Sequence, residues 1–225
     1  MRISCWSGYY AGMNMILESI GSWLTWLFPP TEQAVRIEEM GVAEFKKSVS
    51  LAKEQNPGIT SLFAYKDELV QAAVWELKYH GNIHIGRLLA TLLYEKISDK
   101  LIEQNIFLQK FLVIPLPLSK ERLTERGWNQ SEILAREICK LDKNFLLCTN
   151  ILQKIRHTQP QTKLDRNERL INLKNCFGIT NKKLIQHQHI ILIDDVTTTG
   201  STINEARQLL QSAGVASIQA FTLAH

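Results

Sequence analysis

The sequence predicts an α/β fold in which a mainly parallel, twisted sheet is flanked by helices and carries a helical appendage at its N-terminus. Two observations lead to this prediction. Short apolar runs alternate with helical patterns beyond residue 110, which is typical of βαβ units and a parallel sheet. Residues 190–193 are four consecutive branched residues, as a strand buried on both faces requires. At 225 residues, the chain can bury a sizeable core as one main domain with a smaller attachment.

The composition is that of a soluble globular protein, with 45% hydrophobic and 21% charged residues, and it argues against a disordered chain. The net charge of +4 suits an anionic ligand or nucleic acid but is too small to choose between them. No C-x-x-C pair occurs among the four cysteines, so the sequence indicates neither a zinc site nor a disulfide framework. Scattered thiols of this kind are typical of a reducing cytoplasm.

Residues 13–28 are the most apolar stretch, but Glu18 and Gly21 interrupt them and prolines follow, which makes the stretch short for a membrane span. Their helical spacing predicts an amphipathic helix packed on the main domain. A helix lying on a membrane surface is the less favoured alternative, because its polar face lacks Lys and Arg. No signal peptide is evident, so we expect a cytoplasmic protein without a membrane span. Residues 1–61 form the predicted appendage, with a helical patch around residues 34–52.

The elements of the main domain, residues 62–225, follow from apolar periodicity. Strands are predicted at residues 62–65, 111–115, 151–155, 190–193 and 217–223. Helices are predicted at residues 67–79, 84–103, 129–141 and 202–213, with a Pro-rich turn after residue 115. The polar segment 157–175 is long for a loop in a compact domain, which indicates a functional loop.

Two aspartates, Asp194 and Asp195, follow the most convincing buried strand, and ligands of open α/β sheets lie at the carboxyl ends of such strands. The next residues offer hydroxyl groups, a glycine and the free N–H groups of a following helix, which together form a phosphate cradle. They are Thr197, Thr198, Thr199, Gly200, Ser201 and Thr202. Carboxylates accept hydrogen bonds from vicinal ribose hydroxyls, so this order predicts a sugar phosphate with its ribose at the aspartates. The alternative is a helix cap followed by a polar turn.

Residues 190–202 resemble the phosphoribosyl-pyrophosphate signature of type I phosphoribosyltransferases. Further segments narrow the resemblance to the ComF family, in the family's order across residues 62–225. They are L-K-Y-H-G-N at 77–82, P-L-P-L-S-K at 115–120, R-G-W-N-Q at 126–130, and H-T-Q-P-Q at 157–161 with Arg169 and Asn172. W-L-F-P-P at 26–30 is similar to the stretch that usually precedes the family's cysteine-rich zinc module. Because no cysteine occurs between Cys5 and Cys139, we expect that module to be absent.

The resemblance implies roles for residues outside the acidic pair. It assigns the pyrophosphate of the ligand to the loop after the first core strand, with Arg126 in support; the loop residues are Leu116, Pro117, Ser119 and Lys120. The alternatives are prolines that only shape a turn and a surface ion pair for Arg126. Arg169 would supply positive charge from a mobile loop at residues 156–172, for which a solvated basic loop is the alternative. Pyrophosphate also implies Mg²⁺, whereas we expect no metal site built from the protein alone.

Two functional hypotheses follow. The first is an Mg²⁺-dependent phosphoribosyltransferase-like enzyme that binds phosphoribosyl pyrophosphate, with Asp194, Asp195 and Arg169 as catalytic residues and an acceptor that the sequence does not identify. The second is a non-catalytic competence protein that binds the same ligand and single-stranded DNA. Trp75, Trp128 and the basic segment would then contact DNA, although aromatic residues are more often part of a core. The sequence leaves open whether the chain forms a homo-oligomer.

Overall fold

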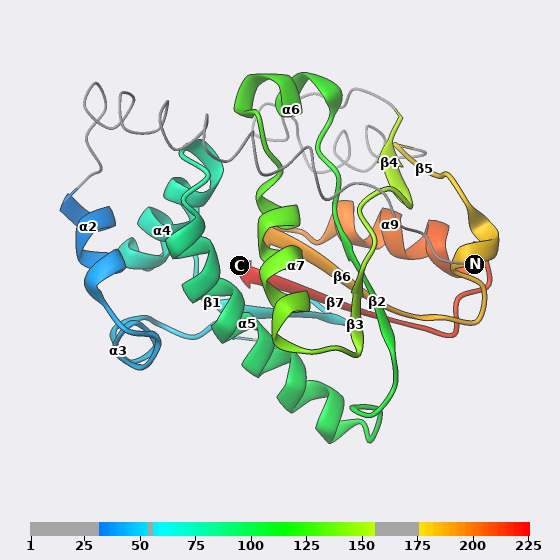
Figure 1. The fold of residues 1–225 in the computed structure, drawn as a ribbon, viewed down its shortest axis with the longest axis horizontal. Coiled ribbons are helices and arrows are strands. Elements are labelled where there is room, and N and C mark those ends of the chain that lie inside the picture. The colour runs from blue at the N-terminus through cyan, green and yellow to red at the C-terminus, as the bar shows by residue number, and fades with distance from the viewer. Residues whose placement is uncertain (1–31, 54–55, 156–175) are drawn as a thin grey trace.

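The computed structural model describes residues 32–53, 56–155 and 176–225, and a five-stranded parallel sheet forms their centre (Figure 1). The strand order is β1-β7-β6-β2-β3, and every neighbouring pair runs parallel. The strands are β1 (Ile59–Phe63), β2 (Phe111–Pro115), β3 (Phe145–Leu147), β6 (His189–Val196) and β7 (Ser217–Ala224). The predicted α/β fold with a mainly parallel sheet is confirmed.

Strand β6 lies in the middle of this sheet, between β7 and β2, and its side chains alternate between two hydrophobic cores. Ile191 and Ile193 belong to the core on one face, while Ile190 and Leu192 belong to the core on the other. All four are fully buried. The prediction of a strand buried on both faces is therefore confirmed, and the physical reason is that helices cover both faces of the parallel sheet.

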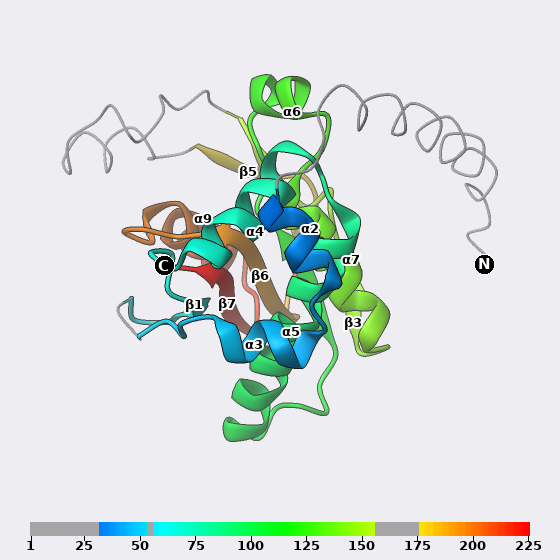
Figure 2. The ribbon, with the colours of Figure 1, turned by 90° about the vertical axis from the view of Figure 1, so that its left-hand side faces the viewer.

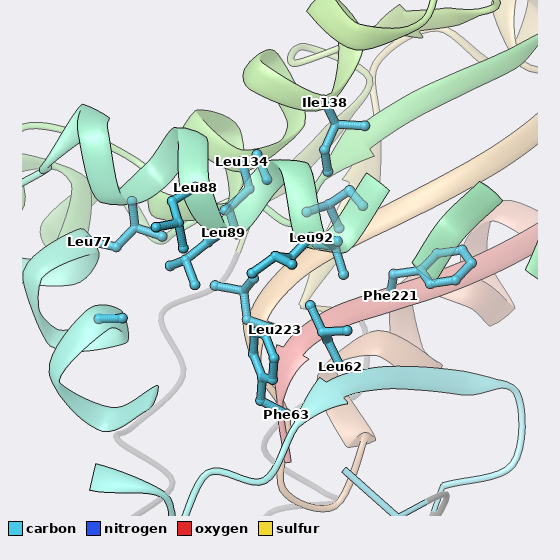
Figure 3. Close-up of a cluster of buried hydrophobic side chains, with 14 of the residues drawn as sticks. Leu62, Phe63, Leu77, Leu88, Leu89, Leu92, Leu134, Ile138, Phe221 and Leu223 are labelled. Carbon is cyan, nitrogen blue, oxygen red and sulfur yellow. The ribbon is translucent and has the colours of Figure 1, made fainter. Parts of the chain in front are cut away.

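The larger core lies under α4 (Glu68–Tyr79), α5 (Ile83–Glu103) and α7 (Gln130–Leu141). Figure 3 shows Leu88, Leu89 and Leu92 of α5 gathered with Leu134 and Ile138 of α7 and with side chains of β7. Helix α9 (Ser201–Ser212) covers the opposite face, where the smaller core contains its residues Ile203, Ala206 and Leu210. The helices thus hold the carboxyl ends of β2, β6 and β7 in a fixed arrangement.

Two short helices before the sheet, α2 (Glu32–Glu39) and α3 (Val42–Ser48), lie beside α4 and α5 (Figure 2). Phe45 of α3 is fully buried, and its ring meets that of Phe63 of β1 edge to face at a centroid distance of 5.9 Å.

The predicted boundary between residues 61 and 62 lies inside β1, and the division into an appendage and a main domain stays a prediction. The predicted amphipathic helix at residues 13–28 lies outside the described residues.

The structure differs from the predicted elements in several places. Residues 120–126 form helix α6 (Lys120–Arg126) beyond the predicted turn, because Ser119 caps its N-terminus and Gly127 ends it. The predicted strand at residues 151–155 is β4 (Leu152–Lys154), which pairs antiparallel with β5 (Phe177–Ile179) in a separate sheet. Strands β3 and β5 have three residues each, too few for a recognisable period. A 3₁₀ turn, η2 (Lys182–Leu184), precedes β6.

None of the described helices combines the length and apolar character needed to cross a membrane.

Candidate functional site

The two aspartates of the predicted site are part of β6 itself. The strand was predicted to end at Ile193, but it continues to Val196, and Asp194 is in register with Thr222 of β7. Pairing with β7 fixes the backbone of both aspartates. Their carboxylates therefore lie at the carboxyl edge of the sheet in a defined position, where ligands of open α/β sheets bind.

Asp194 is held by the beginning of α7. The Ser131 hydroxyl and the backbone N–H of Asp195 each donate a hydrogen bond of 2.9 Å to its Oδ1 atom. Burial by the surrounding protein raises the pKa of Asp194 to about 7, and the negative charge of Asp195 acts in the same direction. The two hydrogen bonds oppose this shift. Because part of the residue still reaches the surface, a ligand can contact this weakly acidic carboxyl group.

Asp195 is paired with a lysine from a distant part of the chain. Its side chain is only 6% exposed, and Nζ of Lys78 in α4 lies 3.0 Å from its Oδ2 atom. This contact has the distance of an ion pair but not the geometry of a hydrogen bond. Oδ2 is buried, and none of the described residues forms a hydrogen bond with it. Oδ2 is therefore shielded from solvent and lies against the Lys78 ammonium group.

The loop after β6 has a rigid backbone. The N–H of Thr197 donates to the carbonyl oxygen of Ala224 at 3.0 Å, and the hydroxyl groups of Thr199 and Ser201 share a hydrogen bond of 2.8 Å. Gly200 adopts a left-handed conformation with φ of 71°. This backbone conformation favours glycine, and a Cβ atom at this position would also lie 2.6 Å from Cδ1 of Ile59, so that the end of the Ile59 side chain would have to move.

Helix α9 begins at this loop with Gly200 as its N-cap, and no side chain caps it there. The positive end of the helix dipole and the amide groups of the first turn favour an anion at such a position. A small polar hollow of about 50 Å³ lies here, lined by Asp194, Val196, Thr197, Thr198, Thr199, Gly200, Ser201, Thr202 and Ile203. The predicted phosphate cradle and the predicted ribose site therefore adjoin each other.

The predicted pyrophosphate loop also lies at this edge of the sheet, but several of its groups make internal contacts. The N–H of Leu116 donates to the carbonyl oxygen of Ile193, and Ser119 caps α6. Arg126 donates to Gln130 at 3.1 Å and lies over the ring of Tyr79. Lys120 is exposed. Pyrophosphate binding by these residues and by Pro117 stays a prediction.

Two of the segments that carry the family resemblance contact each other. Nε1 of Trp128 donates a hydrogen bond of 3.1 Å to the carbonyl oxygen of Leu77. Gly81 is left-handed, with φ of 59°, and a Cβ atom there would lie 2.9 Å from the Trp128 ring. Trp128 thus secures the end of α4, from which Lys78 reaches the acidic pair. Arg169 and the rest of the predicted basic loop lie outside the described residues.

Three site residues were not assigned from the sequence. Lys78 lies inside the L-K-Y segment and Ser131 directly follows the R-G-W-N-Q segment, so the motifs marked their neighbourhood but not their partners. Lys154 of β4 is half-buried, and burial lowers its pKa, while the nearby Asp194 carboxyl group acts in the opposite direction. No sequence signal connects Lys154 with the acidic pair, because only the tertiary fold brings them near each other.

The donor atoms at this edge do not form a complete metal cage. No group of three or more His, Cys, Asp or Glu side chains gathers within residues 32–53, 56–155 and 176–225. Asp194 and Asp195 are the available carboxylates, and Lys78 lies against the second of them. A Mg²⁺ ion at this edge would therefore have to be coordinated largely by a pyrophosphate group and water molecules.

Comparison with known proteins agrees with the fold. Residues 131–225 match the family of phosphoribosyl transferase domains. The chain is 35% identical to competence protein F of Haemophilus influenzae over 159 residues, which are 70% of this chain and 68% of that protein. The chain belongs to the ComF family. The resemblance seen in the sequence is thereby confirmed.

Other relatives of this ComF protein include the DNA utilization protein YhgH of Salmonella typhimurium, which is 31% identical over 153 residues. That alignment covers 67% of this chain and 64% of YhgH, so the chain spans about two thirds of these relatives. Among solved structures, a hypoxanthine phosphoribosyl transferase of Trypanosoma cruzi is 12% identical, with a TM-score of 0.39 and coverage of 61% of this chain and 63% of that one. At this score, nothing about a substrate follows.

The raised pKa of Asp194 predicts a pH-dependent stability. The native carboxyl group keeps its proton up to about pH 7, whereas the unfolded one releases it near 3.8. Its contribution to the free energy of unfolding is therefore fully present below the lower value and is lost as the pH rises through the upper one. We expect Asp194→Asn to remove this decline, measured as urea unfolding midpoints between about pH 4 and 7.

Asp99→Asn, at an exposed position of α5, is the matched control and should keep the wild-type decline. An equal pH dependence for wild type and Asp194→Asn would show that this carboxyl group does not titrate in that range.

Proposed function

We propose that this ComF protein acts in the cytoplasm in the uptake or use of DNA, and that it binds phosphoribosyl pyrophosphate at the carboxyl edge of its sheet. The observation that carries the proposal is the position of the acidic pair directly beside the polar hollow at the N-terminus of α9. This arrangement offers acceptors for hydroxyl groups next to donors for a phosphate. A ribose 5-phosphate unit has the same two features in the same order.

In this proposal, each part of the site recognises a different part of the ligand. Asp194 and Asp195 accept hydrogen bonds from the two ribose hydroxyl groups. The hydroxyl groups of the loop and the first-turn amides of α9 hold the 5-phosphate. Lys120 and the β2 to α6 loop face the pyrophosphate, whose charge Mg²⁺ would neutralise. Arg169 would add positive charge near the departing group if transfer occurs.

DNA binding is proposed from the names of the relatives and from an exposed aromatic cluster. Competence protein F and DNA utilization protein YhgH are both named for processes that involve DNA. Trp75 and Tyr79 of α4 are 45% and 52% exposed, and their ring centroids lie 5.4 Å apart. Exposed rings of this kind provide stacking surfaces for unpaired bases. Trp128 is unsuited to stacking because it packs against Gly81.

The match to phosphoribosyl transferase domains favours a second candidate function, the transfer of the phosphoribosyl group to an acceptor. Transfer releases pyrophosphate, whereas binding alone does not. A pyrophosphate-release assay over nucleobases and amines therefore distinguishes the two functions. We favour binding without transfer, because the named relatives are competence and DNA utilization proteins.

The ribose assignment predicts that the double variant Asp194→Asn, Asp195→Asn binds phosphoribosyl pyrophosphate at least about tenfold more weakly than wild type. Each substitution replaces a carboxyl group by an amide, and the loss of one hydrogen bond costs about 0.5–1.5 kcal/mol, so the loss of two gives a change of this size. Isothermal titration calorimetry in the presence of Mg²⁺ measures this change, with Asp99→Asn as the control. Unchanged affinity in the double variant would rule out the proposed ribose site.

The DNA proposal predicts that Trp75→Ala weakens binding of oligo-dT roughly tenfold, because the loss of one stacked base costs about 1–3 kcal/mol. Fluorescence anisotropy at two salt concentrations provides the measurement. The salt dependence should stay as in wild type, since no positive charge is removed. Leu108→Ala, which truncates a side chain that is 87% exposed between α5 and β2, serves as the control. Equal binding by wild type and Trp75→Ala would exclude this cluster from the DNA site.

A further inference from the structure

Lys78 of α4 forms an ion pair with Asp195, and it belongs to a segment that precedes all but the first strand of the sheet. Its Nζ atom lies 3.0 Å from Oδ2 of Asp195, and its side chain is 22% exposed. A buried carboxylate is costly unless a counter-charge accompanies it. The ion pair with Lys78 supplies this charge before any ligand or metal arrives.

The surroundings of Lys78 direct it toward Asp195. Glu76, the nearest acid on the same helix, is buried and pairs with His80 at 2.8 Å, so it has its own partner. Trp128 holds the end of the helix through the carbonyl oxygen of Leu77. The lysine is thus fixed at one end by its helix and at the other by the acidic pair.

This charge distribution disfavours a divalent ion at Asp195. The Lys78 ammonium group already lies 3.0 Å from Asp195, and it would repel a metal ion placed beside this aspartate. Ribose hydroxyl groups are uncharged and meet no such repulsion. They can therefore approach the acidic pair while Lys78 stays in place beside Asp195.

We propose that Lys78 is a built-in counter-ion of the acidic pair, so that the chain binds the ribose hydroxyls of a phosphoribosyl ligand without a divalent metal at the aspartates. Lys78 is then a positioning residue that acts through Asp195. The inference rests on the proposed function and deepens it. It limits Mg²⁺ to the pyrophosphate part of the ligand.

Ribose 5-phosphate tests this inference, because it has the hydroxyl groups and the 5-phosphate but no pyrophosphate. Calorimetric titrations are carried out in EDTA and in Mg²⁺. We expect wild type to bind with the same affinity in both conditions. Lys78→Met should bind at least about tenfold more weakly in EDTA, and Mg²⁺ should restore part of the affinity by replacing the lost cation. Lys78→Arg should keep the metal independence.

Lys46→Met is the matched control, because Lys46 forms an exposed ion pair with Glu95 at 2.7 Å, in another part of the molecule. A strong Mg²⁺ requirement in wild type would overturn the inference, and so would metal-independent binding by Lys78→Met. The wild-type comparison needs no variant, so the test stands even if Lys78→Met fails to fold. Absence of binding by wild type in either condition would instead contradict the proposed function, and the inference with it.

Discussion

Two buried carboxyl groups at the end of the central strand are the constraint on which the rest of the site depends. Asp194 and Asp195 extend β6 between two hydrophobic cores, where an unpaired negative charge is unfavourable. The chain meets this cost with groups from separate helices, namely the Ser131 hydroxyl of α7 and the Lys78 ammonium group of α4. The positions of both helices relative to the sheet are therefore part of the site.

The site is consequently assembled from most of the described chain. The Ile59 side chain of β1 packs closely on Gly200 in the loop after β6, and Asn56 donates a hydrogen bond to the carbonyl oxygen of Thr198. Residues 131–225, which match the phosphoribosyl transferase domain family, contain the aspartates and the loop after β6. Residues before this range add the counter-charge of Lys78 and the exposed aromatic cluster of Trp75 and Tyr79. Both features lie outside the region that matches the domain family.

The sequence predicted the parts of the fold that depend on local patterns. Four branched residues were enough to identify β6, and the acidic pair followed by a threonine-glycine loop was enough to locate the site. The partners of the aspartates depend on tertiary structure, so Lys78 and Lys154 were not assigned. Helix α6 was missed because seven residues give little periodicity, and β4 was placed without its antiparallel partner because β5 has only three residues. The continuation of β6 through both aspartates comes from pairing with β7, which overrides the low strand propensity of aspartate.

The central claim is that the aspartates and the loop after β6 together bind one phosphoribosyl unit. A crystal structure of the protein with ribose 5-phosphate tests it most directly. The account predicts the phosphate in the polar hollow at the N-terminus of α9, and both ribose hydroxyl groups within hydrogen-bond distance of Asp194 and Asp195. A phosphate bound elsewhere, for example on the exposed side chain of Lys120, with the aspartates free of the sugar, would contradict it.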